Sequence, residues 1–252
     1  MNLKDRIKAL VELSKVLNKD NEEQDEITRM DILPEKSDII LKDLVFQYGG
    51  PHSPKVLDYL SLTIPKGKVT AVVGASGSGK TTLLLACGGM LAPSHGEIRF
   101  QGSNLFSLPS SRRAKMRAVS IGYLFQTLEL VPYLDLTSNV KIATGVSDLV
   151  ANQWRGRLGL GDRCRSYPRE LSHGQRQRVA LARAIAHQPA LVIADEPTGN
   201  LDSASGSEVI EVIERLNRDG ITLVVVTHDQ NLGDRATRHI RMVDGQIDSD
   251  QR

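Results

Sequence analysis

The stretch of sequence that decides the fold is Gly74-Ala75-Ser76-Gly77-Ser78-Gly79-Lys80-Thr81. It matches the pattern G-x-x-x-x-G-K-[ST], in which glycines let the backbone curl around phosphate groups so that its N–H groups point inward. An apolar, strand-like run over 69–73 precedes the loop, and a helical pattern over 81–91 follows it. A helix that begins at such a loop adds the positive end of its dipole to the same anion. We therefore expect residues 74–81 to bind the phosphates of a nucleotide.

Three side chains at the end of this loop carry the specific contacts. Lys80 is expected to reach the β- and γ-phosphates, and the Thr81 hydroxyl to ligate Mg²⁺. Thr82, the next residue of the helix, is assigned to the same nucleotide site. The loop thus predicts binding of a nucleoside triphosphate together with Mg²⁺.

A second part of the site is predicted where an apolar run over 191–194 ends in two adjacent carboxylates, Asp195 and Glu196. Ligands bind at the carboxyl ends of parallel strands, so this end should lie beside the phosphate loop. Asp195 is placed to hold Mg²⁺, and Glu196 to polarise an attacking water as a general base. The competing interpretation is that the Asp-Glu pair only closes the strand as a turn.

Composition excludes several classes of protein. Lysine and arginine total 32 against 30 acidic residues, a net charge of +2, which lacks the basic excess of a nucleic-acid binder. The densest basic run, Arg112, Arg113, Lys115 and Arg117, is interpreted as a solvated face rather than a binding patch. Two cysteines without metal-ligand spacing argue against a zinc site or a disulfide framework. No apolar run approaches the ~20 residues that cross a bilayer, and charges near the N-terminus argue against a signal peptide. We expect a soluble protein that binds no nucleic acid.

The order of apolar runs predicts an α/β fold. From residue 68 strands alternate with helices, which is typical of a P-loop NTPase core of mostly parallel sheet flanked by helices. After the strand at 69–73, further strands are expected over 119–125, 190–194 and 222–227. Earlier runs at 39–46 and 56–64 predict an antiparallel β subdomain, and the lapse of the strand pattern over about 128–170 predicts a short helical subdomain. Residues 1–37 are expected to hold an amphipathic helix at 2–19 and a polar linker, ahead of a nucleotide-binding domain over 38–252.

Further segments carry a resemblance to a known family. Leu171-Ser172-His173-Gly174-Gln175 is similar to the LSGGQ signature of ATP-binding cassette (ABC) proteins. Gln126 resembles the Q-loop glutamine of that family, His228 its switch histidine, and residues 199–202 its D-loop. Tyr48 stands where the family places an aromatic ring that stacks on adenine; the competing interpretation is a tyrosine of the core. The resemblance covers about residues 38–248.

The resemblance implies an ATPase that energises a membrane permease. Gln126 would contact Mg²⁺ and the attacking water, and His228 the γ-phosphate. In this family Ser172, Gly174 and Gln175 complete the site of the opposite subunit, so two ATP molecules are held in a dimer, either of two identical copies or of two different cassettes. The amino-acid sequence of residues 196–202 resembles that of a branch of the family that includes lipoprotein-release and macrolide-export subunits.

That resemblance also implies where the chain acts. It would bind MgATP at the cytoplasmic face of the inner membrane and work in export or mechanotransmission. The alternative is a soluble ABC ATPase that is not tied to transport. One departure from the family is His173, which replaces the first glycine of the signature pair and leaves open whether its side chain points outward or toward the phosphate.

Overall fold

The computed structural model of the protein describes residues 39–48, 53–142, 145–163, 165–199 and 201–251. Contacts group the chain into a sheet unit, which comprises Glu35–Thr127 and Pro189–Arg252, and a helical unit that includes Leu128–Gln188. The helix predicted at 2–19 and the linker after it lie outside the described residues.

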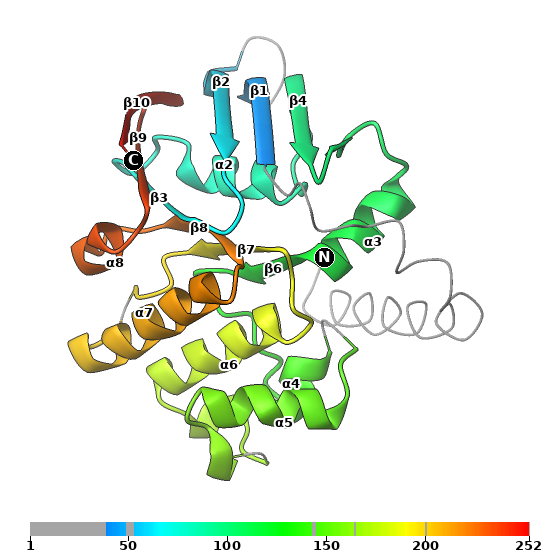
Figure 1. Cartoon of the computed structure of the whole chain (residues 1–252), viewed down its shortest axis with the longest axis vertical. Helices are drawn as coiled ribbons and strands as arrows, with labels where there is room; N and C mark the ends of the chain where they lie inside the picture. Colours follow the sequence, from blue (N-terminus) through cyan, green and yellow to red (C-terminus); the bar gives the residue numbers. More distant parts are fainter. Residues whose placement is uncertain (1–38, 49–52, 143–144, 164, 200, 252) are drawn as a thin grey trace. The chain divides into compact units, whose positions relative to one another are not determined.

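A core sheet of six strands forms the centre of the sheet unit (Figure 1). From one edge to the other its strands are β10 (Gln246–Gln251), β9 (Arg238–Val243), β3 (Val69–Val73), β8 (Thr222–Val226), β7 (Leu191–Asp195) and β6 (Ile121–Leu124). Every neighbouring pair is parallel except β10 with β9. All five residues of β8 are buried, because a central parallel strand is covered on both faces. The prediction of a mostly parallel core sheet is confirmed.

A second, antiparallel sheet of four strands belongs to the same unit. Its order is β2 (Lys55–Ile64), β1 (Ile39–Gln47), β4 (His95–Phe100) and β5 (Ser103–Asn104). Buried and less buried residues alternate along most of β2, as expected where one face of a sheet packs on a core. β1 and β2 were predicted as strands, whereas β4 and β5 were not.

In the described part of the sheet unit the helices are α2 (Lys80–Cys87), α3 (Ser110–Ser120), α7 (Ser203–Arg218) and α8 (Gln230–Asp234). Helix α2 lies between the two sheets and contacts β7 and β8 on one side and β1 and β2 on the other (Figure 1). A single apolar cluster, with Leu83 and Ile98 among its fully buried members, joins α2 to both sheets. The helix that carries the phosphate-binding residues is therefore held in the hydrophobic core.

The helical unit contains α4 (Leu136–Lys141), α5 (Asp148–Arg157), α6 (His173–Ile185) and two short 3₁₀ turns, η2 (Gly161–Arg163) and η3 (Pro168–Glu170). It extends to Gln188, beyond the predicted 128–170, because α6 packs against α4 and α5. The fully buried amide of Asn139 accepts from the N–H of Val131 at 2.7 Å and donates to the carbonyl of Leu134 at 2.8 Å, which fixes the loop before α4.

One boundary differs from the prediction. A strand was expected from residue 119, but α3 continues to Ser120 and β6 begins at Ile121. Val119 is 52% exposed, so its apolar character does not mark a buried strand. Among the helices that the structure describes, none is long and apolar enough to cross a membrane.

Candidate nucleotide-binding and hydrolysis site

The predicted phosphate loop connects β3 to α2, and its glycines are required by close packing. Gly79 has a φ of 97°, and a Cβ on it would lie 2.7 Å from the carbonyl oxygen of Val56. A Cβ on Gly74 would lie 2.4 Å from the carbonyl oxygen of Met242. Both distances are too short for any other residue, so the loop is fixed against two neighbouring strands.

Lys80 folds back over this loop. Lys80 is buried, with only 8% of the residue exposed. Its Nζ donates to the carbonyl oxygens of Gly74 and Ala75, each at 2.8 Å. The ammonium is thereby held at the centre of the loop, where a phosphate anion would meet it. The buried hydroxyl of Ser78 has no hydrogen-bond partner among the described residues, as expected of a polar group in a loop shaped for a ligand.

Two oxygen donors converge where Mg²⁺ was predicted. Thr81 Oγ1 donates to Asp195 Oδ2 at 3.3 Å, although the two residues are 114 positions apart in the sequence. Burial raises the pKa of the Asp195 carboxyl, and the Thr81 hydrogen bond and the charge of Lys80 oppose that shift. No group of three or more His, Cys, Asp or Glu side chains that could hold a metal occurs among the described residues. This sparse oxygen set suits Mg²⁺, which keeps waters and substrate phosphates as its other ligands.

Glu196 stands directly after the end of β7 in an unusual backbone conformation. Its φ is 50°, and its N–H donates to the carbonyl of Val226 at 2.9 Å. Its Oε1 lies 3.3 Å from Nε2 of His228, and its Oε2 accepts from the backbone N–H of His228 at 3.2 Å. The carboxylate is mostly buried, with 15% of its side chain exposed, whereas the His228 side chain is 61% exposed. Glu196 is thus fixed in place while the imidazole remains open to a ligand.

Most of the predicted site residues line one cavity of about 480 Å³, a volume typical of small-molecule sites. All of its walls come from the sheet unit. The predicted site residues that line it are Ser76, Gly77, Gly79, Lys80, Thr81, Thr82, Gln126, Asp195, Glu196 and His228. The predicted residues Gly74, Ala75 and Ser78 form the loop behind that wall and do not line the cavity.

Tyr48 lies beside the cavity rather than in its wall. Its ring is 54% exposed, which is incompatible with the core interpretation, and its hydroxyl lies 3.2 Å from Thr82 Oγ1. A half-exposed ring tethered to a residue of the cavity wall can offer its face to a base.

The signature residues belong to the helical unit. Ser172 is the N-cap of α6: its Oγ accepts from the N–H of Gln175 at 3.2 Å, and Gln175 Oε1 accepts from the N–H of Ser172 at 3.0 Å. Gly174 follows in the first turn and is buried. This capping box fixes the helix start, where unpaired N–H groups complement an anion.

Three residues of the cavity wall were not predicted: Val56, Gly199 and Val226. Val226 ends β8, and the rule that ligands bind at the carboxyl ends of parallel strands could have found it. Gly199 belongs to the segment predicted as the D-loop, but the prediction assigned it no contact with the nucleotide. Val56 belongs to β2, a strand that the sequence predicted, but no local signal places the start of that strand beside the phosphate loop.

Comparisons with known proteins show which proteins this chain is similar to. A model of the family described as ABC transporter matches residues 57–199. The lipoprotein-releasing system ATP-binding protein LolD of Geobacter metallireducens is 42% identical over 217 residues, which cover 82% of this chain and 96% of that protein. The macrolide export ATP-binding/permease protein MacB of Hyphomonas neptunium is 39% identical over 220 residues, 84% of this chain. The chain spans about a third of the length of that relative, 34%.

A solved structure shows the same fold. The ATP-binding cassette MJ0796, as a dimer in a post-hydrolysis state bound to ADP and Pi, superposes with a TM-score of 0.79 at 32% identity. The match covers 85% of this chain and 98% of that one. Another dimeric structure of MJ0796, described as a bacterial ABC transporter cassette, superposes equally well.

Proposed function

The chain belongs to the ABC transporter family, and from this premise we propose that it binds MgATP in the cavity described above and uses hydrolysis to drive a membrane permease. The observation that supports this best is the convergence of residues from separate segments of the chain on one cavity. Lys80 and Thr81 of the phosphate loop meet Asp195, Glu196 and His228 from two other strand ends.

Each side chain in the cavity has a role that its position supports. Lys80 would neutralise the β- and γ-phosphates, and Thr81, Asp195 and Gln126 would hold Mg²⁺. The bound ion would supply charge neutralisation on the phosphate oxygens. Glu196 would accept a proton from the attacking water, and the exposed imidazole of His228 would donate a hydrogen bond to the γ-phosphate. Tyr48 would stack on the adenine.

We propose that the working unit is a dimer of two copies of this chain. Ser172, Gly174 and Gln175 of one copy would cover the γ-phosphate bound by the other, with the α6 N-terminus directed at the anion. The dimeric state of MJ0796 supports this arrangement. ATP would then join the copies, and its hydrolysis would release them.

The proposed partner is an integral membrane permease at the cytoplasmic face of the inner membrane. The name of the MacB relative, an ATP-binding/permease protein of macrolide export, supports a permease as the partner of a domain of this kind. The LolD relative belongs by its name to a lipoprotein-releasing system. We therefore favour export or force transmission across the membrane as the work done.

The test is a combined measurement of hydrolysis and assembly. The purified chain should release phosphate from ATP only when Mg²⁺ is present, and sedimentation should show a dimer in the Glu196→Gln variant with MgATP but not with ADP. Wild-type hydrolysis without an ATP-dependent dimer in that variant would contradict the dimer mechanism. Failure to co-purify with a membrane protein from its native membrane would favour the soluble ABC ATPase over the transport function.

A further inference from the structure

The C-terminal end of α2, opposite the end that holds the phosphate loop, is closed by a Schellman motif. The N–H of Met90 donates to the carbonyl of Leu85 at 2.9 Å, and the N–H of Gly89 to that of Ala86 at 2.9 Å. Gly89 has a φ of 64°, the left-handed conformation that this motif requires. The motif leaves the carbonyls of Gly88 and Gly89 to be satisfied from outside the helix.

Two side chains from the next elements of the chain satisfy them. The hydroxyl of Tyr123, in the middle of β6, donates to the carbonyl of Gly88. The Nη1 of Arg117, in the last turn of α3, donates to the carbonyl of Gly89 at 3.1 Å. A cation at the C-terminal end of a helix also interacts favourably with the helix dipole.

Steric contact reinforces these two hydrogen bonds. A Cβ on Gly88 would lie 2.6 Å from Cε1 of Tyr123 and 3.1 Å from Cδ1 of Ile193, so the helix end rests directly on these two side chains. Tyr123 and Ile193 are paired across β6 and β7. Three residues after Tyr123 the chain reaches Gln126, and two residues after Ile193 it reaches Asp195, both in the cavity wall.

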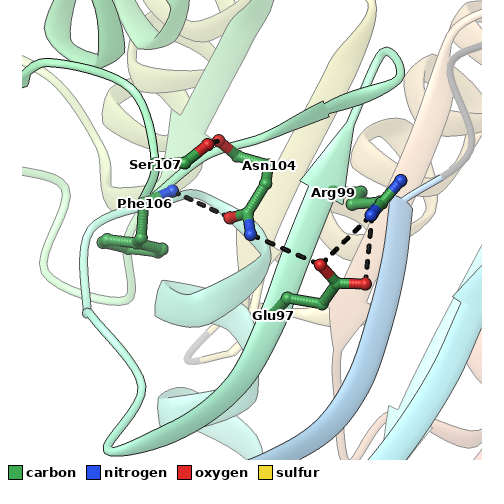
Figure 2. A network of polar contacts seen from close by, with 5 residues as sticks. All are labelled: Glu97, Arg99, Asn104, Phe106 and Ser107. Carbon is green, nitrogen blue, oxygen red and sulfur yellow. Dashed lines mark hydrogen bonds and ion pairs between the residues drawn. The ribbon is translucent and has the colours of Figure 1, made fainter.

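The turn between β5 and α3, the helix that presents Arg117, is held by a network of polar contacts (Figure 2). Asn104 Oδ1 accepts from the N–H of Phe106 at 3.1 Å, and its Nδ2 donates to Glu97 Oε2 at 3.4 Å. The guanidinium of Arg113 lies 4.8 Å from the centre of the Phe106 ring. The turn from β5 into α3 is therefore fixed.

The tyrosine hydroxyl is a constant donor. Burial raises the pKa of Tyr123 above its usual range, and the nearby charge of Arg117 opposes this shift only in part. The phenol stays protonated at every pH at which the protein would work. Its ring stacks on that of Phe125 with centroids 5.7 Å apart and an interplanar angle of 12°, which fixes its direction.

We propose that Tyr123 and Arg117 are positioning residues for ATP hydrolysis: they hold the end of α2 against β6 and so fix the distance between the phosphate-binding residues and the strand-end residues Gln126 and Asp195. The proposal rests on the proposed function, because the distance matters only if MgATP binds in this cavity. Neither residue touches the cavity, so both act through the backbone of α2.

The test compares the full-length wild type with Tyr123→Phe, which removes only the hydroxyl. Because the phosphate loop is unchanged, KM for ATP should stay within about twofold, whereas kcat should fall about fivefold to tenfold through loss of one positioning hydrogen bond. A fluorescent ATP analogue gives a second readout without turnover. Its affinity in EDTA should match wild type, and the gain in affinity on adding Mg²⁺ should be reduced at least about threefold.

Two controls separate positioning from loss of stability. Tyr59→Phe removes the hydroxyl of a 60% exposed tyrosine in β2 and should change none of these values. Arg117→Met should reproduce the kcat and Mg²⁺ effects, and Arg117→Lys, which keeps the charge, should restore part of them. Activity is measured well below the melting temperature of each variant.

Unchanged kcat and unchanged Mg²⁺ response in Tyr123→Phe would overturn the proposal. So would a loss of kcat that disappears on cooling in parallel with recovered stability. If the wild type itself hydrolysed no ATP, the proposed function would fail, and the Mg²⁺-dependent binding of the analogue would still decide the positioning role.

Discussion

Glu196 is held by His228 at two points: one carboxylate oxygen accepts the backbone N–H of His228 at 3.2 Å, and the other lies 3.3 Å from its Nε2. The histidine follows β8 and the glutamate follows β7, two strands that are paired in parallel. The pairing of the strands therefore sets the geometry of the pair, and the glutamate cannot rotate away without breaking a contact to the backbone.

The first prediction concerns Glu196→Gln. Glutamine keeps the size and the acceptor for the His228 N–H but cannot take a proton, so turnover should fall about 10²- to 10⁴-fold while MgATP binding persists. Phosphate release and equilibrium ATP binding measure the two effects. As a control, Glu208→Gln in α7 should hydrolyse ATP at the wild-type rate. Near wild-type turnover in Glu196→Gln would show that another group is the base.

The second prediction separates the two contacts of Tyr48. Tyr48→Ala removes the ring and should weaken ATP binding by the ~1–3 kcal/mol typical of stacking on a base, about 5- to 150-fold. Tyr48→Phe removes only the hydroxyl bonded to Thr82 and should bind ATP nearly as wild type does. Titration with a fluorescent ATP analogue measures both. Equal losses in the two variants would assign the contribution to the hydroxyl instead of the ring.

The third prediction concerns the ion pair that ties β9 to β10. Arg238, 5% exposed, donates to both carboxylate oxygens of Asp250 at 2.7 and 2.6 Å and also to the carbonyl of Thr63 in β2. Asp250→Asn leaves the buried guanidinium without its counter-charge and should lower the free energy of unfolding by about 3 kcal/mol. This corresponds to a fall of about 6–12 °C in Tm.

The same hairpin offers a matched control for that variant. Asp248 lies 3.5 Å from Nε of Arg241, and both side chains are more than half exposed. Asp248→Asn should therefore cost less than about 1 kcal/mol. Similar melting temperatures for the two variants would show that the Arg238 pair does not stabilise the fold beyond a surface pair.

The fourth prediction concerns Cys87, which is fully buried at the end of α2. Burial raises its pKa from 9.0 to about 12, so the folded protein holds the neutral thiol. In a Cys164→Ser background, native protein should resist a thiol reagent at pH 8.5 and react after unfolding. Rapid labelling of the native protein would show that the end of α2 opens.

The same shift fixes a pH dependence of stability. Above pH 9 the unfolded chain loses the thiol proton while the folded chain keeps it, so the free energy of unfolding should fall as pH rises toward 12. This residue contributes up to about 1.4 kcal/mol per pH unit in that range. Cys87→Ala should show a shallower decline than wild type when unfolding by urea is followed at each pH.

Most of the fold could be predicted from the sequence because its central strands are continuous apolar runs. Val69–Val73 and Thr222–Val226 are buried along nearly their whole length, and both were predicted within one residue. The strand β4 was missed, since its few apolar residues alternate with charged ones and it pairs with β1, 50 or more residues earlier in the chain. Long-range pairing of this kind has no local signal.

The candidate site, like the fold, could be predicted from the sequence only in part. The rule for strand ends was sufficient to predict Asp195 beside Thr81, because it depends only on topology. The arginines of α3 show the opposite case: they were interpreted as a solvated face, yet Arg113 covers the Phe106 ring and Arg117 caps α2. The interpretation is correct for Arg112 and Lys115, which are exposed. The spacing of charged residues along a helix does not show which of them contact another helix or loop and which face solvent.

The left-handed backbone of Glu196 has a consequence for how this domain would evolve. A non-glycine residue with a φ of 50° carries a conformational cost of about 1–3 kcal/mol, which glycine would not bear. Selection for folding alone would therefore favour glycine or asparagine at this position. Under the proposed role of Glu196 as the base, a lineage that no longer needed hydrolysis would gain stability by such a replacement, whereas selection for turnover would keep the glutamate.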